Sequence, residues 1–259
     1  MTTLTDRAIS ALRNRHDTLA ELVAAATDEQ LAAISGAVDW SVADVLSHLG
    51  SGAEIMRFPI LAAIDGTPAP DGGRQPIWDR WNALSPREQA TQFVDHDERY
   101  VATVEALDDG QRAELVVDLG FLPQPVPLEV ALGMRLDEVA LHAWDVLVAQ
   151  DATASLDDES AGILLELMGG SMGFLLGFLG KADQLEHEVV LQVGDRALSI
   201  GDTLSLGAGP GSPTATWVGP DEAVVRLVVG RLGAAHTPAG VQVKGNVTID
   251  ELRRVFPGF

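Results

Sequence analysis

The 259-residue chain contains no cysteine. This absence excludes disulfide bonds, thiolate metal ligands and a cysteine nucleophile supplied by the chain itself. Any thiol chemistry must therefore use a thiol that comes from outside the protein. Lysine is nearly absent as well, since Lys181 and Lys244 are the only two, and arginine carries the rest of the positive charge.

Positive charge is scarce throughout the chain. The chain has only 17 basic residues but 38 acidic ones, which gives a formal net charge of -21. Such an acidic surface repels nucleic acid and anionic membranes. We therefore expect neither as a partner, and we expect the ligand to be a cation or a small molecule. For the oligomeric state we expect a monomer or a homodimer.

The chain also lacks an apolar signal segment near its start, because residues 1–19 follow an amphipathic helical pattern. We therefore expect a cytoplasmic protein. The longest apolar run, residues 163–180, is interrupted by Glu166 and has glycines four residues apart at Gly169, Gly173 and Gly177. Because a membrane span needs about 20 apolar residues, we predict a buried helix at a domain junction instead.

Long amphipathic helices are predicted for the first 150 or so residues. Ser41 with Asp44 and Ser85 with Glu88 have the spacing of capping boxes, each of which begins a helix. Connections of moderate length between four such helices are typical of a four-helix bundle. The predicted helices cover approximately residues 4–26, 41–64, 85–107 and 128–149.

The sequence pattern changes after about residue 186. From there on, short runs rich in β-branched residues alternate with Gly, Asp and Pro, which is typical of strands separated by turns. Residues 220–233 predict a helix, and Thr248 predicts the cap of a closing helix. The expected fold class is α plus α+β. A four-helix bundle would span residues 1–152, and a smaller α+β domain would span residues 153–259.

One polar stripe stands out on the last predicted helix of the bundle, in the sequence MRLDEVALHAWDV. At 3.6 residues per turn its four polar residues fall within an arc of roughly 80° between bulky apolar neighbours. An ordinary solvent face is broader, so the stripe indicates a line that faces a cavity or the bundle interior. We predict that it faces a metal ion. The stripe consists of Arg135, Glu138, His142 and Asp145.

Two members of the stripe have the spacing of metal ligands. Glu138 and His142 are four residues apart, so they lie one above the other on a helix and can share an ion. His48, on a facing helix, is the candidate third ligand, and small neighbours there would leave room for a bound molecule. A His₂Glu set is a known catalytic zinc shell that leaves the fourth position open. The small or short neighbours are Asp44, Ser47, Ser51 and Gly52.

These spacings taken alone are equally typical of ordinary structure. Glu138 and His142 could form a weak surface pair, and His48 could be a half-buried structural histidine. Asp44 and Asp145 could orient a ligand imidazole or be ordinary helix charges. His96 lies in the run DHDER, which predicts a solvated charge cluster. No partner spacing is found for His16, His187 and His236.

The segment DWSVADVLSHLGS and, about 90 residues later, RLDEVALHAWDV resemble the mycothiol-dependent maleylpyruvate isomerase family. That family has an N-terminal DinB-like bundle whose second helix opens with a Trp before a Val-x-Asp-x-x-x-His-Leu run. The end of the chain, VVGRLG followed by VKGNVTIDELRRVFPGF, looks like the family's small C-terminal domain, which is related in fold to sterol carrier proteins.

The resemblance implies that His48, Glu138 and His142 bind a divalent metal, for which we expect Zn²⁺, and act in catalysis through it. It also implies mycothiol, the low-molecular-weight thiol of actinobacteria, as thiol cosubstrate for a small-molecule electrophile. The reaction would be isomerisation of a maleylpyruvate-type acid or sulfur transfer. An arginine of the family's C-terminal domain lies near the active site. Arg226 or Arg231 could match it as a catalytic or cofactor-binding residue, although surface arginines are the more ordinary interpretation.

Two other classes of function stay open at this point. The bundle could be a non-catalytic binding module for a metal or small molecule, or a metal-stabilised structural module. It could also be a metal-dependent hydrolase, for which Asp44 is the only obvious general base. An open fourth coordination position would favour catalysis, whereas a closed four-ligand shell would favour structure.

Overall fold

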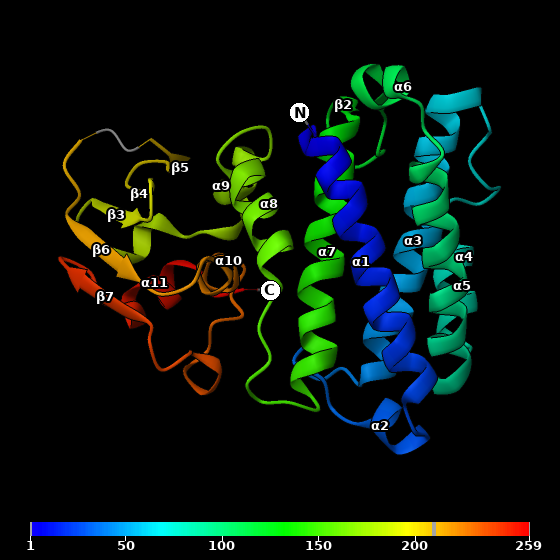
Figure 1. Cartoon of the computed structure of the whole chain (residues 1–259), viewed down its shortest axis with the longest axis horizontal. Helices are drawn as coiled ribbons and strands as arrows, with labels where there is room; N and C mark the ends of the chain where they lie inside the picture. The colour runs from blue at the N-terminus through cyan, green and yellow to red at the C-terminus, as the bar shows by residue number, and fades with distance from the viewer. Residues whose placement is uncertain (1, 209–210, 259) are drawn as a thin grey trace. The chain divides into compact units, whose positions relative to one another are not determined.

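The computed structural model describes residues 2–208 and 211–258. The chain divides into two compact units, Met1–Ala154 and Ser155–Phe259. Unit 1 is helical, and unit 2 combines helices with a five-stranded sheet (Figure 1). This arrangement confirms the predicted fold class. The boundary after Ala154 lies two residues beyond the one expected from the sequence.

Four long helices lie side by side in unit 1 (Figure 1). Their ends lie within two residues of the predicted ones, and two helices begin at the predicted residue. Both expected capping boxes are present, at Ser41 with Asp44 and at Ser85 with Glu88. α3 packs along α5, and α1 packs against both α5 and α7. The long helices are α1 (Leu4–Ala25), α3 (Val42–Asp65), α5 (Pro86–Glu105) and α7 (Leu128–Val148).

Several short elements of unit 1 were not predicted, because each is too short to show a hydrophobic period. They lie in the connections between the long helices, and the two short strands pair antiparallel before α7. Capping boxes begin α2 and α6. These elements are α2 (Asp28–Ala32), α4 (Gln75–Asn82), α6 (Asp109–Glu114), β1 (Val116–Val117) and β2 (Val126–Pro127).

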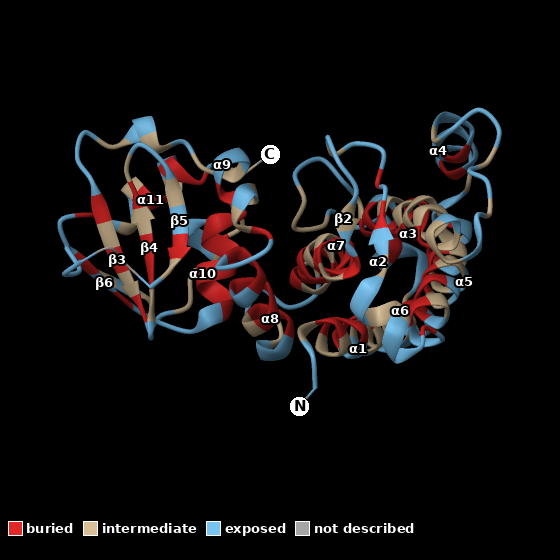
Figure 2. Cartoon of the chain, turned by 90° about the horizontal axis from the view of Figure 1, so that it is seen from above, coloured by how far each residue is buried: buried red, intermediate tan, exposed pale blue. Residues whose placement is uncertain are grey.

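Unit 2 is built on a sheet with the strand order β5-β4-β3-β6-β7, antiparallel except for the β3–β6 pair. Alternate residues of β3 are buried, and the side chains of α10 are almost all buried (Figure 2). The strands are β3 (Val189–Val193), β4 (Arg196–Ile200), β5 (Leu204–Gly207), β6 (Ala215–Val218) and β7 (Gln242–Gly245). The helices are α8 (Asp158–Met168), η1 (Gly173–Leu175), α9 (Leu176–Leu179), η2 (Ala182–Gln184), α10 (Asp221–Val228), η3 (Ala234–His236) and α11 (Ile249–Val255).

The apolar run at residues 163–180 is not one helix, so the prediction of a single buried helix was wrong. α8 ends at Met168, where Gly169 and Gly170 follow, and the amide of Met172 turns back to the carbonyl of Leu167 at 2.8 Å. α8 and Gly173–Leu179 meet at 84°. Among the described residues no individual helix has the length and hydropathy needed to cross a membrane, although this bent pair passes the same test when taken together.

Helices α3 and α5 approach closely at Gly50. A Cβ atom there would lie 2.9 Å from the Cα atom of Phe93 and 2.2 Å from the ring of Trp81. A backbone atom of a packed helix cannot give way as a flexible side chain can, so this glycine is required by packing. By contrast, a Cβ atom at Gly162, inside α8, would meet nothing within 4 Å.

Alanine is therefore expected to have opposite effects at these two helical glycines. Gly50→Ala should lower the free energy of unfolding by about 1–3 kcal/mol through overpacking. Gly162→Ala should raise it by up to about 1 kcal/mol, because alanine is the better helix former. Urea denaturation of each variant measures both values. Effects of the same sign would contradict the close approach of α3 and α5 at Gly50.

Candidate metal centre

Three of the predicted site residues come together between α3 and α7. The Ser41 cap begins α3, which places His48 in its second turn, and α7 carries Glu138 and His142 one turn apart. Nε2 of His48 lies 2.8 Å from Oε2 of Glu138, and Nε2 of His142 lies 3.7 Å from the same oxygen. One ligand atom from each side chain lies within 4.8 Å of the other two. Two helices thus present a His₂Glu set at one point.

This set is accessible from solvent. The side chains of His48 and Glu138 are 41% and 51% exposed, whereas that of His142 is 12% exposed. Solvent therefore reaches the side chains of His48 and Glu138, while that of His142 is mostly covered. An accessible three-ligand set is typical of catalytic rather than structural zinc sites.

Asp145 orients the imidazole of His142. Its carboxylate is fully buried, and its Oδ2 lies 2.8 Å from Nδ1 of His142, one turn away on α7. A carboxylate accepts the Nδ1 proton, and this leaves the lone pair of Nε2 directed toward Glu138. The sequence left two interpretations of Asp145 open, an imidazole partner or an ordinary helix charge. The contact with His142 supports the first.

Replacing Asp145 by Asn is expected to weaken zinc binding about 10- to 100-fold, the usual cost of losing a carboxylate behind a ligand imidazole. Competition with a chromophoric chelator measures the zinc Kd. Asp137→Asn, about two turns earlier on the same helix, is the matched control and should leave the Kd unchanged. Equal Kd values for Asp145→Asn and the wild type would show that His142 needs no such partner.

The charges around Glu138 keep its carboxylate ionised. Partial burial raises the pKa, but the hydrogen bond from His48 and the positive charges of His142 and Arg135 outweigh it, so the pKa of Glu138 falls to about 2. A carboxylate must be deprotonated to bind a metal. At neutral pH Glu138 is therefore ready to act as a ligand.

Trp40 forms an aromatic wall beside the two histidines. Its ring stacks on that of His142, with centroids 6.1 Å apart and planes at 14°, and its centroid lies 5.3 Å from that of His48. The side chain is 37% exposed although it is large and apolar. Sequence reasoning placed Trp40 in the motif but gave it no role at the site, because its position depends on the loop before α3. Asp39, with φ of 64°, is part of that loop.

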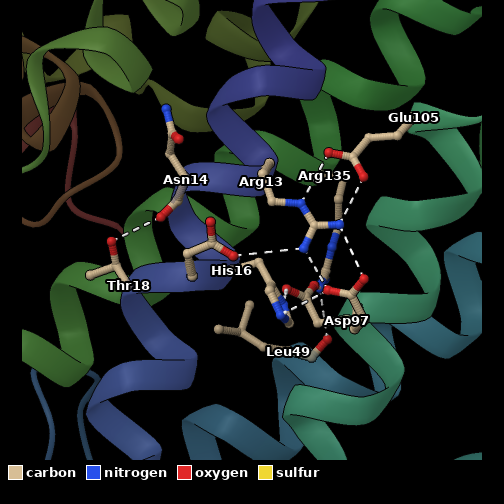
Figure 3. Close-up of polar contacts among 10 residues, drawn as sticks. Arg13, Asn14, His16, Thr18, Leu49, Asp97, Glu105 and Arg135 are labelled. Atoms are coloured by element: carbon tan, nitrogen blue, oxygen red, sulfur yellow. Dashed lines mark hydrogen bonds and ion pairs between the residues drawn. The ribbon is translucent and has the colours of Figure 1, made fainter.

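Arg135 does not face the metal site, so this part of the stripe prediction was wrong. Its guanidinium is 2% exposed, and Nη2 donates to Oδ1 of Asp97 on α5 at 2.6 Å (Figure 3). The long side chain carries the charge away from the line of Glu138 and His142 and into the bundle interior. Nη1 of Arg135 would lie 3.1 Å from a Cβ atom at Gly52. The space beside Gly52 is thus filled by Arg135 rather than left for a bound molecule.

The run DHDER is solvated only in part, because its first and last residues are exposed whereas Asp97 is buried. Asp97 is 1% exposed, and its Oδ2 lies 3.0 Å from Nδ1 of His16 on α1. Burial disfavours charge on His16, but the hydrogen bond and negative charge of Asp97 outweigh it and raise the pKa of His16. His96 is also half-buried, and its Nδ1 lies 3.4 Å from Glu54. Spacing could not reveal these partners, because they lie on other helices.

Asp44 has a capping role. It is exposed, and its Oδ2 accepts hydrogen bonds from the amide of Ser41 at 2.9 Å and from the hydroxyl of Ser41 at 2.6 Å. These bonds occupy the same oxygen and fix the carboxylate at the start of α3. The contacts of Asp44 therefore support its capping function and offer no support for a general base or an imidazole partner.

The two candidate arginines belong to unit 2. Arg226 is 1% exposed, so the surface interpretation is wrong for it, and its Nε and Nη2 donate to the Glu222 carboxylate at 2.7 and 3.0 Å. Its Nη1 donates to the carbonyl of His236 at 2.8 Å. Arg231 is half-buried and follows α10. A role of either arginine toward substrate or thiol stays a prediction.

Sequence relatives of the chain are found in Mycobacterium tuberculosis. Uncharacterised proteins from two strains are each 27% identical to it over 153 residues, which cover 59% of this chain and 72% of the relative. These proteins carry no described activity, so they indicate kinship alone.

Two solved structures share the fold. Crystal structures of the mycothiol-dependent maleylpyruvate isomerase and of a histidine-to-alanine mutant of it superpose with TM-scores of 0.63 and 0.64. Their sequences are 18% and 17% identical to this one, and each comparison covers 95% of this chain and 98% of the other. At this identity the likeness establishes the fold.

The model of one protein family matches more than half of the chain. It is described as the mycothiol maleylpyruvate isomerase N-terminal domain, and it covers residues 12–147. This range includes α3 and α7 with all three candidate ligands. The chain therefore belongs to the mycothiol maleylpyruvate isomerase family, as its two sequence motifs had indicated.

Proposed function

We propose that this protein is a zinc enzyme that uses mycothiol as its thiol cosubstrate and isomerises a small cis-enedione acid of the maleylpyruvate type. The observation that carries the proposal is the solvent-accessible His₂Glu set of His48, Glu138 and His142, with one ligand atom of each within 4.8 Å of the others. Family membership supplies the thiol, and the absence of cysteine agrees with a thiol that is imported.

The residues present fit a divalent zinc ion. Two neutral imidazole nitrogens and one carboxylate oxygen are ligands that zinc prefers, and three protein ligands leave a fourth position for a bound molecule. Asp145 supplies the carboxylate partner that ligand histidines usually have. A zinc ion held there would keep a bound thiol ionised at neutral pH, which makes it a nucleophile.

The chemistry then depends on what the chain's own side chains hold in place. His48, Glu138 and His142 would hold the zinc ion that binds the sulfur, and the ring of Trp40 covers one side of the imidazoles. Addition of the mycothiol thiolate forms a C–S bond at one alkene carbon and moves the π electron pair onto the conjugated carbonyl as an enolate, so the former double bond can rotate. Return of that electron pair breaks the C–S bond, restores the double bond in the trans form and releases the thiolate unchanged.

Sulfur transfer is the second activity that this site supports, since it uses the same thiol and the same exposed ligand set. In that case the adduct leaves with the sulfur, and mycothiol is consumed. Hydrolysis finds less support, because the carboxylate considered as its general base, Asp44, is hydrogen bonded to Ser41 at the start of α3.

The test is to incubate zinc-loaded protein with maleylpyruvate or a reactive electrophile, with and without mycothiol. We expect turnover only when mycothiol is present. Recovery of free mycothiol at the end of the reaction identifies isomerisation, and its stoichiometric loss identifies sulfur transfer. Equal rates with and without mycothiol would refute thiol dependence, and zinc binding without turnover in either arm would favour a binding module.

A further inference from the structure

Beneath the proposed metal centre, three helices contribute a chain of buried polar groups. His16 on α1, Asp97 on α5 and Arg135 on α7 are 5%, 1% and 2% exposed. Figure 3 shows the imidazole and the guanidinium converging on the carboxylate, at 3.0 Å from His16 Nδ1 and 2.6 Å from Arg135 Nη2. We call these three residues the buried triad.

Stability alone does not account for the triad. Buried ion pairs lose their hydration, and apolar residues of similar volume often stabilise a protein as well or better. Arg135 carries an additional cost, because its Nε is buried and has no hydrogen-bond partner among the described residues. A group that is unfavourable to bury and incompletely paired calls for another explanation.

The position of Arg135 supplies that explanation. It precedes the ligand Glu138 by one turn of α7, and its Nη2 also donates to the backbone carbonyl of Leu49 at 3.0 Å. Leu49, which Figure 3 labels, directly follows the ligand His48 in the sequence of α3. One guanidinium group therefore joins the two ligand-bearing helices at the level of their ligands.

The contact with α3 depends on a glycine. A Cβ atom at Gly52 would lie 3.1 Å from Nη1 of Arg135, which is tighter than an ordinary contact. The absence of a side chain at Gly52 allows the guanidinium to lie against the backbone of α3. The ring of Tyr100 on α5 lies 5.5 Å from the guanidinium carbon and supports the group from another helix.

Zinc binding is sensitive to such spacing. Zinc–ligand bonds are about 2.0–2.2 Å long for nitrogen and oxygen, with little tolerance. His48 is on α3, whereas Glu138 and His142 are on α7, so a small shift between the two helices changes every distance to His48. Functional sites need positional control of about 0.5 Å from supporting residues.

We propose that Arg135, held by Asp97 and His16, is a positioning residue that sets the spacing between α3 and α7 at the metal centre. The inference rests on the proposed function, because it requires that His48, Glu138 and His142 bind a metal. Asp97 anchors the guanidinium from α5, and His16 holds Asp97 from α1. Through these contacts, the packing of the bundle core fixes the distances between His48 on α3 and the two ligands on α7.

The decisive variant is the double replacement Arg135→Met with Asp97→Leu in the full chain. Apolar side chains of similar size should keep the free energy of unfolding near the wild-type value. The zinc Kd, measured by chelator competition, should nevertheless rise about 10- to 100-fold, as when other supporting groups of metal sites are lost. The visible absorption spectrum of the cobalt-loaded variant should also differ from that of the wild type.

Two further variants separate positioning from general destabilisation. Val104→Ala creates a cavity at a fully buried position of α5, two turns beyond Asp97, and should lower stability without changing the zinc Kd. Gly52→Ala improves helix propensity but displaces the guanidinium. It should raise the Kd by more than Val104→Ala does at an equal or greater loss of stability, and it decides the matter if the double variant does not fold.

The possible outcomes are distinct. If the wild type binds zinc and the folded double variant has the same Kd and cobalt spectrum, the triad is structural and this inference is wrong, although the proposed function stands. If the double variant does not fold, Gly52→Ala is used instead. An unchanged zinc Kd and cobalt spectrum for Gly52→Ala would likewise show that the triad is only structural. If the wild type itself binds no zinc, both the proposed function and the inference fail.

Discussion

Replacement of His48, Glu138 or His142 by alanine is expected to remove the metal ion from the protein. The wild type should carry about one divalent ion per chain, and each variant should carry almost none after dialysis. Removing a ligand leaves two donors where zinc requires at least three from the protein. The loss of affinity should therefore exceed the about 10- to 100-fold expected for replacing a supporting group such as Asp145.

Elemental analysis of the purified proteins measures this loss directly. His187→Ala is the matched control, because His187 is an exposed histidine of unit 2 that contacts the Asn246 carbonyl and has no part in the site. Thermal unfolding adds a second readout. Zinc should raise the Tm of the wild type and of the control, since it binds the folded state, but not that of the ligand variants.

Because the side chains of His48 and Glu138 are 41% and 51% exposed, the metal-free His48→Ala and Glu138→Ala variants should unfold at about the same temperature as the metal-free wild type. Metal-free His142→Ala should unfold at a lower temperature, because it removes a partner of the buried Asp145 carboxylate. A loss of metal would then reflect missing ligands rather than a damaged bundle. Full metal retention in all three variants would place the ion elsewhere and would remove the basis of the proposed function.

The second large effect is expected in unit 2, where Glu222→Leu should lower the free energy of unfolding by about 3–5 kcal/mol. Glu222 is 3% exposed and accepts two hydrogen bonds from the guanidinium of Arg226. An arginine side chain stays charged even when buried. Loss of its partner therefore leaves an uncompensated positive charge among the apolar side chains of α10.

Scanning calorimetry can show which of the two units loses stability in Glu222→Leu. We expect the transition of unit 2 to shift to lower temperature, while zinc binding by unit 1 stays intact. The double variant Glu222→Leu with Arg226→Met should recover most of the lost stability, because an apolar pair needs no charge compensation. A single transition that shifts as a whole would argue that the two units unfold together and are not separate domains.

Local patterns in the sequence were enough to predict the long helices of unit 1 and the presence of strands in unit 2. Periodic apolar residues and capping boxes depend on neighbours three or four positions away, so α3 and α5 could be predicted to begin at Ser41 and Ser85. The same locality made Glu138 and His142 recognisable as a pair on one helix face. His48 became a candidate because small residues surround it on a helix expected to face α7, and its motif's resemblance to a family then supported it; no spacing linked it directly to α7.

Tertiary structure decided which way the polar side chains point. Arg135 shares a narrow stripe with Glu138 and His142, yet its longer side chain reaches across to Asp97 and the Leu49 carbonyl. The charged run around Asp97 looks solvated in sequence, but that carboxylate lies in the bundle core because α1 and α7 supply His16 and Arg135. Sequence spacing within one helix carries no information about partners on another.

The same distinction applies to Trp40 and to the break after α8. Trp40 reaches His142 only because the loop before α3 folds back on α7, where the amide of Gly36 donates to the carbonyl of Asp145 at 2.7 Å. The apolar run at residues 163–180 contains glycines that permit either a straight helix or a turn, and packing within unit 2 selected the turn. Composition and periodicity thus determined the long helices and their approximate ends, whereas contacts between distant segments determined the metal centre.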